Sequence, residues 1–160
     1  MDDLLNEKII GELQKFIDHY FVLKTFNISE DIAHESMYNE EIIDFIENKR
    51  KPSLQKLLFD FIDQKGATDP EIYHKAGVDR KLFSKIRSNP SYRPRKNTII
   101  SLALALELEQ EETDTLLNSA GYTLSDSETF DLIIQFCIKK KIYHIHDVNQ
   151  ALEHYDLKPL

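Results

Sequence analysis

The sequence contains little glycine and a single cysteine, and both scarcities exclude classes of site. It has four glycines in 160 residues. None of them forms a GxGxxG or GxxxxGK[ST] pattern, so no phosphate-binding loop of those kinds is expected. Cys137 has no second cysteine to pair with, which excludes an internal disulfide and fits a reducing compartment.

Long apolar runs are also missing. The first residues, MDDLLNEKIIGELQKF, start with acids, and polar residues interrupt the apolar ones at short intervals. This pattern fits neither a signal peptide nor a membrane span. We therefore expect a cytoplasmic protein without a membrane partner.

Charge is unevenly distributed along the chain. Residues 1–50 hold 12 acids and 5 bases, residues 51–100 hold 5 acids and 11 bases, and residues 101–160 hold 11 acids and 4 bases. The formal net charge is -8, yet the middle third alone carries an excess of positive charge. Within residues 75–96 the only carboxylate is Asp79. Such a basic segment indicates a surface that meets something negative.

Hydrophobic periodicity predicts helices throughout and no strand, so the fold class is all-α. In residues 1–51, an N-terminal helical segment, helices are expected over about 3–25, from Ser29, and over 40–49. Pro52 marks a boundary. Five helices follow in residues 52–122, over about 53–64, 68–76, 79–88, 97–108 and 110–120. Residues 123–160 form a two-helix C-terminal extension, with helices over 127–140 and 146–154.

EIYHKAGVDRKLFSKI, residues 71–86, fits a helix-turn-helix. Gly77 lies where the sharp turn needs a residue that tolerates positive φ. The apolar spacing predicts that Ile72, Ala76, Val78, Phe83 and Ile86 lock the two helices together. The candidate DNA-binding residues are the exposed ones of the second helix and the following loop: Arg80, Lys81, Ser84, Lys85, Arg87, Tyr92, Arg93, Arg95 and Lys96.

Residues 53–122 resemble the five-helix DNA-binding domain of phage repressors and Cro-like bacterial regulators. The order of helices and the segment KAGVDRKLFSKI carry the resemblance. It implies a repressor-like, regulatory protein that binds double-stranded DNA. Arg80, Lys81, Ser84 and Lys85 would read the groove, and Arg87, Arg93, Arg95 and Lys96 would hold phosphates.

A second resemblance runs from about Ser53 to the C-terminus. DRKLFSKIRSNPSYRP, LLNSAGYTLS and FDLIIQFCIKKKIYHIHDVNQAL are similar to a helical module that follows macro domains in bacterial proteins. The 50 residues upstream are too few and too poor in glycine to form a macro domain. The ADP-ribose chemistry of those partners is therefore not expected here.

Alternatives for the basic face remain open. It could dock on an acidic partner protein, or on the acidic flanks of the same chain, or have no role. In the corresponding alternative function the protein is an interaction adaptor or a partner subunit of a bacterial toxin or phage-defence effector system. Tyr73, Asp69 and Asp79 favour it, because they depart from the DNA-binding family pattern.

The remaining expectations concern assembly and chemistry. The helix predicted over residues 3–25 is either core or a dimerisation element, and a homo-oligomer is expected because paired DNA half-sites need two copies. Cys137, His144 and His146 match no standard zinc spacing, so neither a metal nor a cofactor is expected. Paired acids lie on polar helix faces, and no enzymatic activity is expected.

Overall fold

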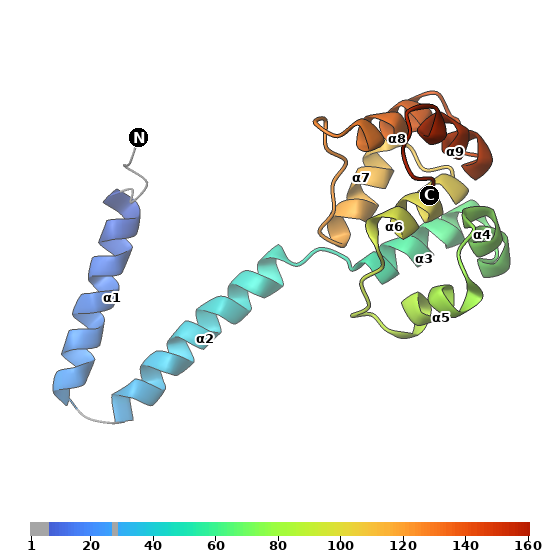
Figure 1. Cartoon of the computed structure of the whole chain (residues 1–160). Helices are drawn as coiled ribbons and strands as arrows, with labels where there is room; N and C mark the ends of the chain where they lie inside the picture. The colour runs from blue at the N-terminus through green and yellow to red at the C-terminus, as the bar shows by residue number, and fades with distance from the viewer. Residues whose placement is uncertain (1–6, 27–28) are drawn as a thin grey trace. The chain divides into compact units, whose positions relative to one another are not determined.

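The computed structural model describes residues 7–26 and 29–160, and in these ranges every regular element is a helix. The all-α prediction is confirmed. Two compact units separate after Arg50, one of residues 1–50 and one of residues 51–160. Figure 1 shows the helices of each unit.

The first unit consists of two long helices, α1 (Glu7–Phe26) and α2 (Ser29–Lys49). Residues 3–6 of the predicted first helix lie outside the described residues. The prediction of two helices between residue 29 and residue 49 is wrong, because α2 is continuous through Tyr38 and Asn39. Neither proline nor glycine occurs in this stretch, so the backbone has no reason to leave the helix there.

The second unit contains seven described helices joined by short connections. Their bounds are α3 (Leu54–Lys65), α4 (Asp69–Ala76), α5 (Arg80–Ser88), α6 (Lys96–Ala105), α7 (Gln110–Ser119), α8 (Thr129–Lys139) and α9 (Ile145–His154).

Caps set several of these boundaries. The Ser53 hydroxyl accepts the Lys56 N–H at 3.2 Å at the start of α3. Thr68 and Glu71 form a reciprocal capping box at the start of α4, where Pro70 occupies the first turn. Hydrogen bonds from the Thr68 backbone and side chain hold the pKa of the Glu71 carboxyl below its ordinary value. The sequence thus fixes these helix ends locally.

Helix α6 forms the centre of the core. Every residue from Ile99 to Ala105 is buried, and α6 packs against α4, α7 and α9. The same core takes in Ile134 and Cys137 of α8 and Leu152 of α9. The two C-terminal helices are therefore part of the same packed unit as α3 to α7.

The structure has no membrane-spanning candidate in its described residues. Within 7–26 and 29–160, no helix is both long and apolar enough to cross a bilayer.

Candidate nucleic-acid interface

Helices α4 and α5 are joined by a tight turn at Gly77. Gly77 adopts φ 65° and ψ 26°, a left-handed conformation that costs glycine little. The Val78 N–H donates to the Tyr73 carbonyl at 2.9 Å, which closes the end of α4. Asp79 then caps α5, its carboxylate accepting the Lys81 N–H at 2.8 Å. The turn thus directs α5 away from the axis of α4 within five residues.

An aromatic cluster holds α5 against the rest of the unit. Phe83 is 2 % exposed and meets the Phe59 ring of α3 edge-on at 5.8 Å. The Tyr73 ring of α4 lies 5.5 Å from the Phe83 ring. Ile86, one turn further along α5, is also buried. A large Tyr73 at this position therefore fills the space between α4 and α5.

The opposite face of α5 is open to solvent. Arg80, Lys81, Ser84 and Lys85 are all exposed, and their spacing puts them on adjacent positions of one face. Among the described residues, neither Arg80 nor Lys81 has an ion-pair partner. Figure 1 places α5 at one edge of the second unit, on the opposite side from α8 and α9.

Arg87 also lies on α5, but its guanidinium forms an ion pair with the Asp69 carboxylate. Its Nε and Nη2 donate to the two oxygens of Asp69, at the start of α4, over 2.6 and 2.7 Å. Its guanidinium also stacks on the Phe59 ring at 3.9 Å, and Gln55 donates a side-chain hydrogen bond to its carbonyl. Arg87 therefore fastens α5 to α4 and α3, and Asp69 puts a negative charge next to the basic face.

The loop after α5 carries Tyr92, Arg93 and Arg95. The Lys85 ammonium lies 4.6 Å from the centre of the Tyr92 ring, and the Arg93 guanidinium 4.3 Å from that of Tyr122. The Tyr122 hydroxyl donates to the Pro94 carbonyl at 3.0 Å, which ties the loop to the segment after α7. Arg93 and Arg95 are both exposed. The structure thus holds Tyr92 against Lys85 of α5 and Arg93 against Tyr122, which follows α7.

Lys96 has a different environment from the other candidate residues. Its ammonium lies 2.8 and 2.7 Å from the two carboxylate oxygens of Asp131 on α8. Asp131 is 2 % exposed and also accepts the Ser125 N–H at 2.8 Å. Sequence reasoning did not single out Asp131. Lys96 therefore stabilises the contact between α6 and α8. Because Asp131 neutralises its charge, Lys96 would contribute little to the binding of an external anion.

The described residues form no metal site, and the one cysteine among them is buried. No group of three or more His, Cys, Asp or Glu side chains could hold a metal ion in residues 7–26 and 29–160. Cys137 is buried in the core, and burial raises the pKa of its thiol, which disfavours the reactive thiolate. His144 and His146 face each other edge-on with ring centres 6.5 Å apart, which is no more than a pair.

Comparisons with known proteins add no relative. No family model, no curated protein and no solved structure matches the chain.

Proposed function

We propose that the protein binds double-stranded DNA through the exposed face of α5, with α4 and α5 acting as a helix-turn-helix. The observation that carries the proposal is the division of α5 into two faces. One face is buried through Phe83 and Ile86, and the other presents Arg80, Lys81 and Lys85 with no carboxylate of its own after the Asp79 cap. A helix of this kind fits the major groove.

The roles follow from position along α5. Arg80 and Lys81 lie in its first turn, where the helix dipole also favours a phosphate, and their long side chains suit guanine edges. Ser84 and Lys85 lie one turn later on the same face. Arg93 and Arg95 would hold the flanking backbone, where contacts add affinity without choosing a sequence. A regulatory role at a promoter is the function class that such an interface serves.

The test is the salt dependence of DNA affinity. Fluorescence anisotropy with random-sequence duplex, repeated over a salt series, should give log K falling with log salt by roughly 0.9 per phosphate contact. The Arg80→Ala, Lys81→Ala, Lys85→Ala variant should flatten this slope by up to about three contacts and bind roughly 30- to 100-fold more weakly at low salt.

The matched control removes three exposed lysines elsewhere. Lys139, Lys140 and Lys158 lie in or after α8 and α9, and replacing all three by alanine changes the net charge by the same amount. This control should bind within about 3-fold of the wild type, because net charge acts only weakly across a Debye length of roughly 10 Å. An equal loss in both variants, or no binding by the wild type at low salt, would exclude the α5 face as a DNA-binding surface.

Asp69→Asn is expected to strengthen DNA binding. The substitution removes a negative charge beside the α5 face and leaves the Arg87 guanidinium at most one of its two hydrogen bonds to this side chain, because an asparagine amide has a single accepting oxygen. Affinity should rise about 3- to 10-fold, and the salt slope should steepen by about one contact. The same anisotropy titration measures both effects. Glu153→Gln on α9 makes the same change of charge away from α5 and should leave the affinity unchanged; a similar gain there, or a loss in Asp69→Asn, would count against the assignment.

A second candidate function is that of an adaptor or partner subunit in an effector system. Asp69 favours it, because this carboxylate lies in the rim of the α5 face, where it would repel a phosphate but could pair with a basic residue of a protein partner. Under this function, Asp69→Asn weakens binding to the protein partner, and random duplex does not bind at low salt.

A further inference from the structure

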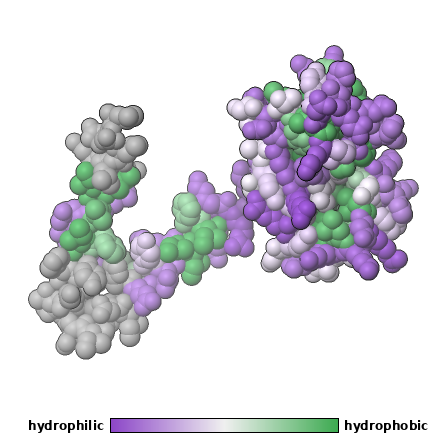
Figure 2. Space-filling view, in the orientation of Figure 1, coloured by the Kyte–Doolittle hydropathy of each residue, from purple (hydrophilic) through white to green (hydrophobic). Residues whose placement is uncertain are grey.

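The two helices of the first unit expose an unusual number of large apolar side chains. The described ones are between 37 % and 64 % exposed: Ile9, Ile10, Leu13, Phe16, Ile17, Met37, Tyr38, Ile42, Ile43, Phe45 and Ile46. Figure 2 shows hydrophobic residues gathered on the surfaces of α1 and α2. These side chains pack against too little of the unit to be its finished core.

The apolar positions form a broad stripe on each helix. Ile9, Leu13 and Phe16 of α1 follow a four-three spacing, and Tyr38, Ile42 and Phe45 of α2 repeat it. Ile10, Ile17 and Ile46 widen the two stripes by one position each. A stripe of this width is typical of helices in a bundle, where each helix is covered by more than one neighbour. Two helices alone give each other only one neighbour.

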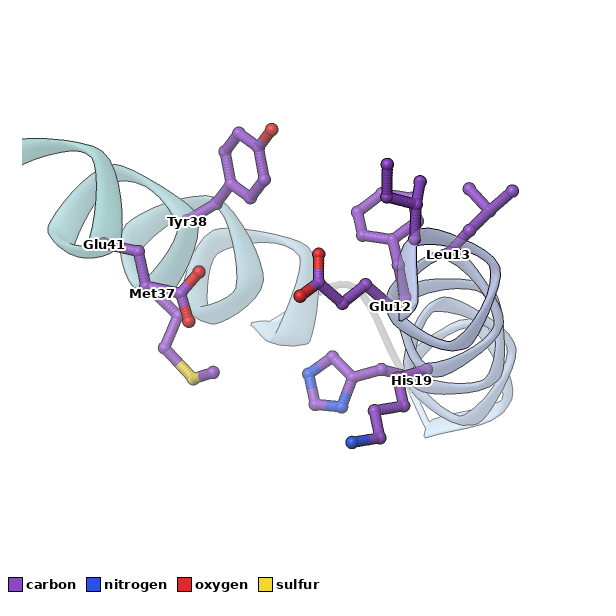
Figure 3. A pocket seen from close by; sticks show the side chains of 9 residues that line it. Glu12, Leu13, His19, Met37, Tyr38 and Glu41 are labelled. Carbon is purple, nitrogen blue, oxygen red and sulfur yellow. The ribbon is translucent and has the colours of Figure 1, made fainter. Parts of the chain in front are cut away.

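A groove between α1 and α2 shows the same incompleteness. It has a volume of about 750 Å³ and is lined by Leu13 and Phe16 from α1 and by Met37 and Tyr38 from α2, among others. Figure 3 shows that Glu12 and His19 of α1 also extend into the space facing α2. Polar and charged side chains therefore lie among the apolar ones in this groove, with Glu41 on the α2 side, so α1 and α2 do not form a closed apolar contact with each other.

The exposed apolar area matches what a stable dimer buries. If a large side chain has roughly 150–200 Å² of surface, then eleven such side chains at about half exposure present on the order of 900 Å² per chain. The largest apolar patch of an ordinary monomer is only about 300–600 Å². A stable interface takes about 800 Å² from each partner.

The second unit offers no matching surface. Its large exposed apolar side chains, within the described residues 51–160, are Leu132, Phe136 and Tyr155. These cannot cover eleven side chains. A second copy of α1 and α2 can, because it carries the same stripes with the same length and width.

We propose that α1 and α2 associate with α1 and α2 of a second copy to form a four-helix bundle, so that the protein is a homodimer. In this dimer the apolar stripes of both copies face a shared core. The inference does not depend on DNA binding by α5. It concerns a different unit, and it is tested without DNA.

Charge predicts how salt changes the dimer. Residues 1–50 hold 12 acids and 5 bases, so two copies repel each other in the bundle. Added salt screens this repulsion and strengthens apolar association. Docking of the acidic helices on the basic α5 face would instead weaken as salt is added. The direction of the salt effect therefore distinguishes the two arrangements.

Sedimentation equilibrium of the full chain tests the inference. The wild type should sediment at twice the 18.8 kDa chain mass, with a dissociation constant that falls as salt is raised. Ile42→Gln with Phe45→Gln should weaken the dimer at least about 100-fold, because each lost apolar contact occurs twice in a symmetric interface. Ile10→Gln with Leu13→Gln should do the same from α1.

Glu40→Gln with Glu47→Gln is the matched control. It introduces the same residue type, a good helix former, at exposed positions on the opposite face of α2. Because it removes negative charge, the dimer should be kept or strengthened. Thermal unfolding is measured on every full-length variant. The transition of the second unit, residues 51–160, should be unchanged, because all substitutions lie in the first unit.

Three results would overturn the inference. The first is a monomer at every concentration and salt. The second is a dimer that persists in both apolar-to-Gln variants. The third is an association that weakens as salt is added.

Discussion

Lys96→Met is expected to lower the free energy of unfolding by about 3–5 kcal/mol, because it leaves the Asp131 carboxylate buried without its counter-charge. Both Asp131 oxygens accept hydrogen bonds from the Lys96 ammonium, at 2.8 and 2.7 Å, and Asp131 is 2 % exposed. Methionine keeps most of the length of the lysine side chain, so the change is mainly one of charge. Urea unfolding at neutral pH, followed by far-ultraviolet circular dichroism, measures the loss.

A second substitution should restore much of that stability. In Lys96→Met with Asp131→Asn no unpaired charge is left, and the asparagine oxygen can still accept the Ser125 N–H. More than half of the lost stability is expected to return, and the double-mutant cycle should give a coupling of at least about 2 kcal/mol. A loss below about 1 kcal/mol for Lys96→Met alone would contradict the structural role assigned to this pair.

The Lys56–Asp60 pair provides the control. It is also a lysine–aspartate ion pair, with 3.1 Å between Nζ and Oδ2, but its side chains are 64 % and 47 % exposed. Lys56→Met is expected to cost less than about 1 kcal/mol, because solvent screens an exposed pair and side-chain entropy opposes it. The comparison isolates burial as the cause of the Lys96 effect.

Local signals in the sequence predicted much of the second unit. The helix starts predicted near residues 68 and 79 and the turn predicted at Gly77 each depend on residues within one helical turn, and the structure has all three, with Thr68 and Asp79 as the caps. The apolar spacing likewise predicted that Phe83 and Ile86 are buried. Such features are readable because neighbours in sequence determine them.

Long-range partners could not be read in the same way. In the sequence, Arg87 and Lys96 cannot be told from an unpaired cation such as Arg80. In the structure, Arg87 pairs with Asp69, 18 residues before it. Lys96 pairs with Asp131, 35 residues after it. Periodicity tells which face of a helix is polar; it does not tell which distant residue that face meets. For the same reason, the sequence did not show that α8 and α9 share a core with α3 to α7. Their apolar stripes predict that each helix is covered, but not by which other helices.

Phe83→Ala is expected to destabilise the second unit by about 3–5 kcal/mol, through lost burial and the cavity left behind. Phe83 lies between the rings of Phe59 and Tyr73, which come from α3 and α4, so the cavity would open at the point where α5 is held. Urea unfolding measures the loss. Phe136→Ala on α8 is the matched control, because Phe136 is 55 % exposed and its removal should cost less than about 1 kcal/mol.

DNA affinity should follow a different course in Phe83→Ala than in the triple variant of Arg80, Lys81 and Lys85. None of the basic side chains is changed, so molecules that stay folded should keep the salt slope of the wild type while the amplitude of binding falls with the folded fraction. Lowering the temperature or adding a stabilising osmolyte should then restore binding in Phe83→Ala and leave the triple variant weak. If fully folded Phe83→Ala showed a flatter dependence of log K on log salt than the wild type, the packing of Phe83 would be needed to place the basic side chains of α5 at the phosphates. If instead its stability loss stayed below about 1 kcal/mol, the aromatic cluster would not be what holds α5 in place.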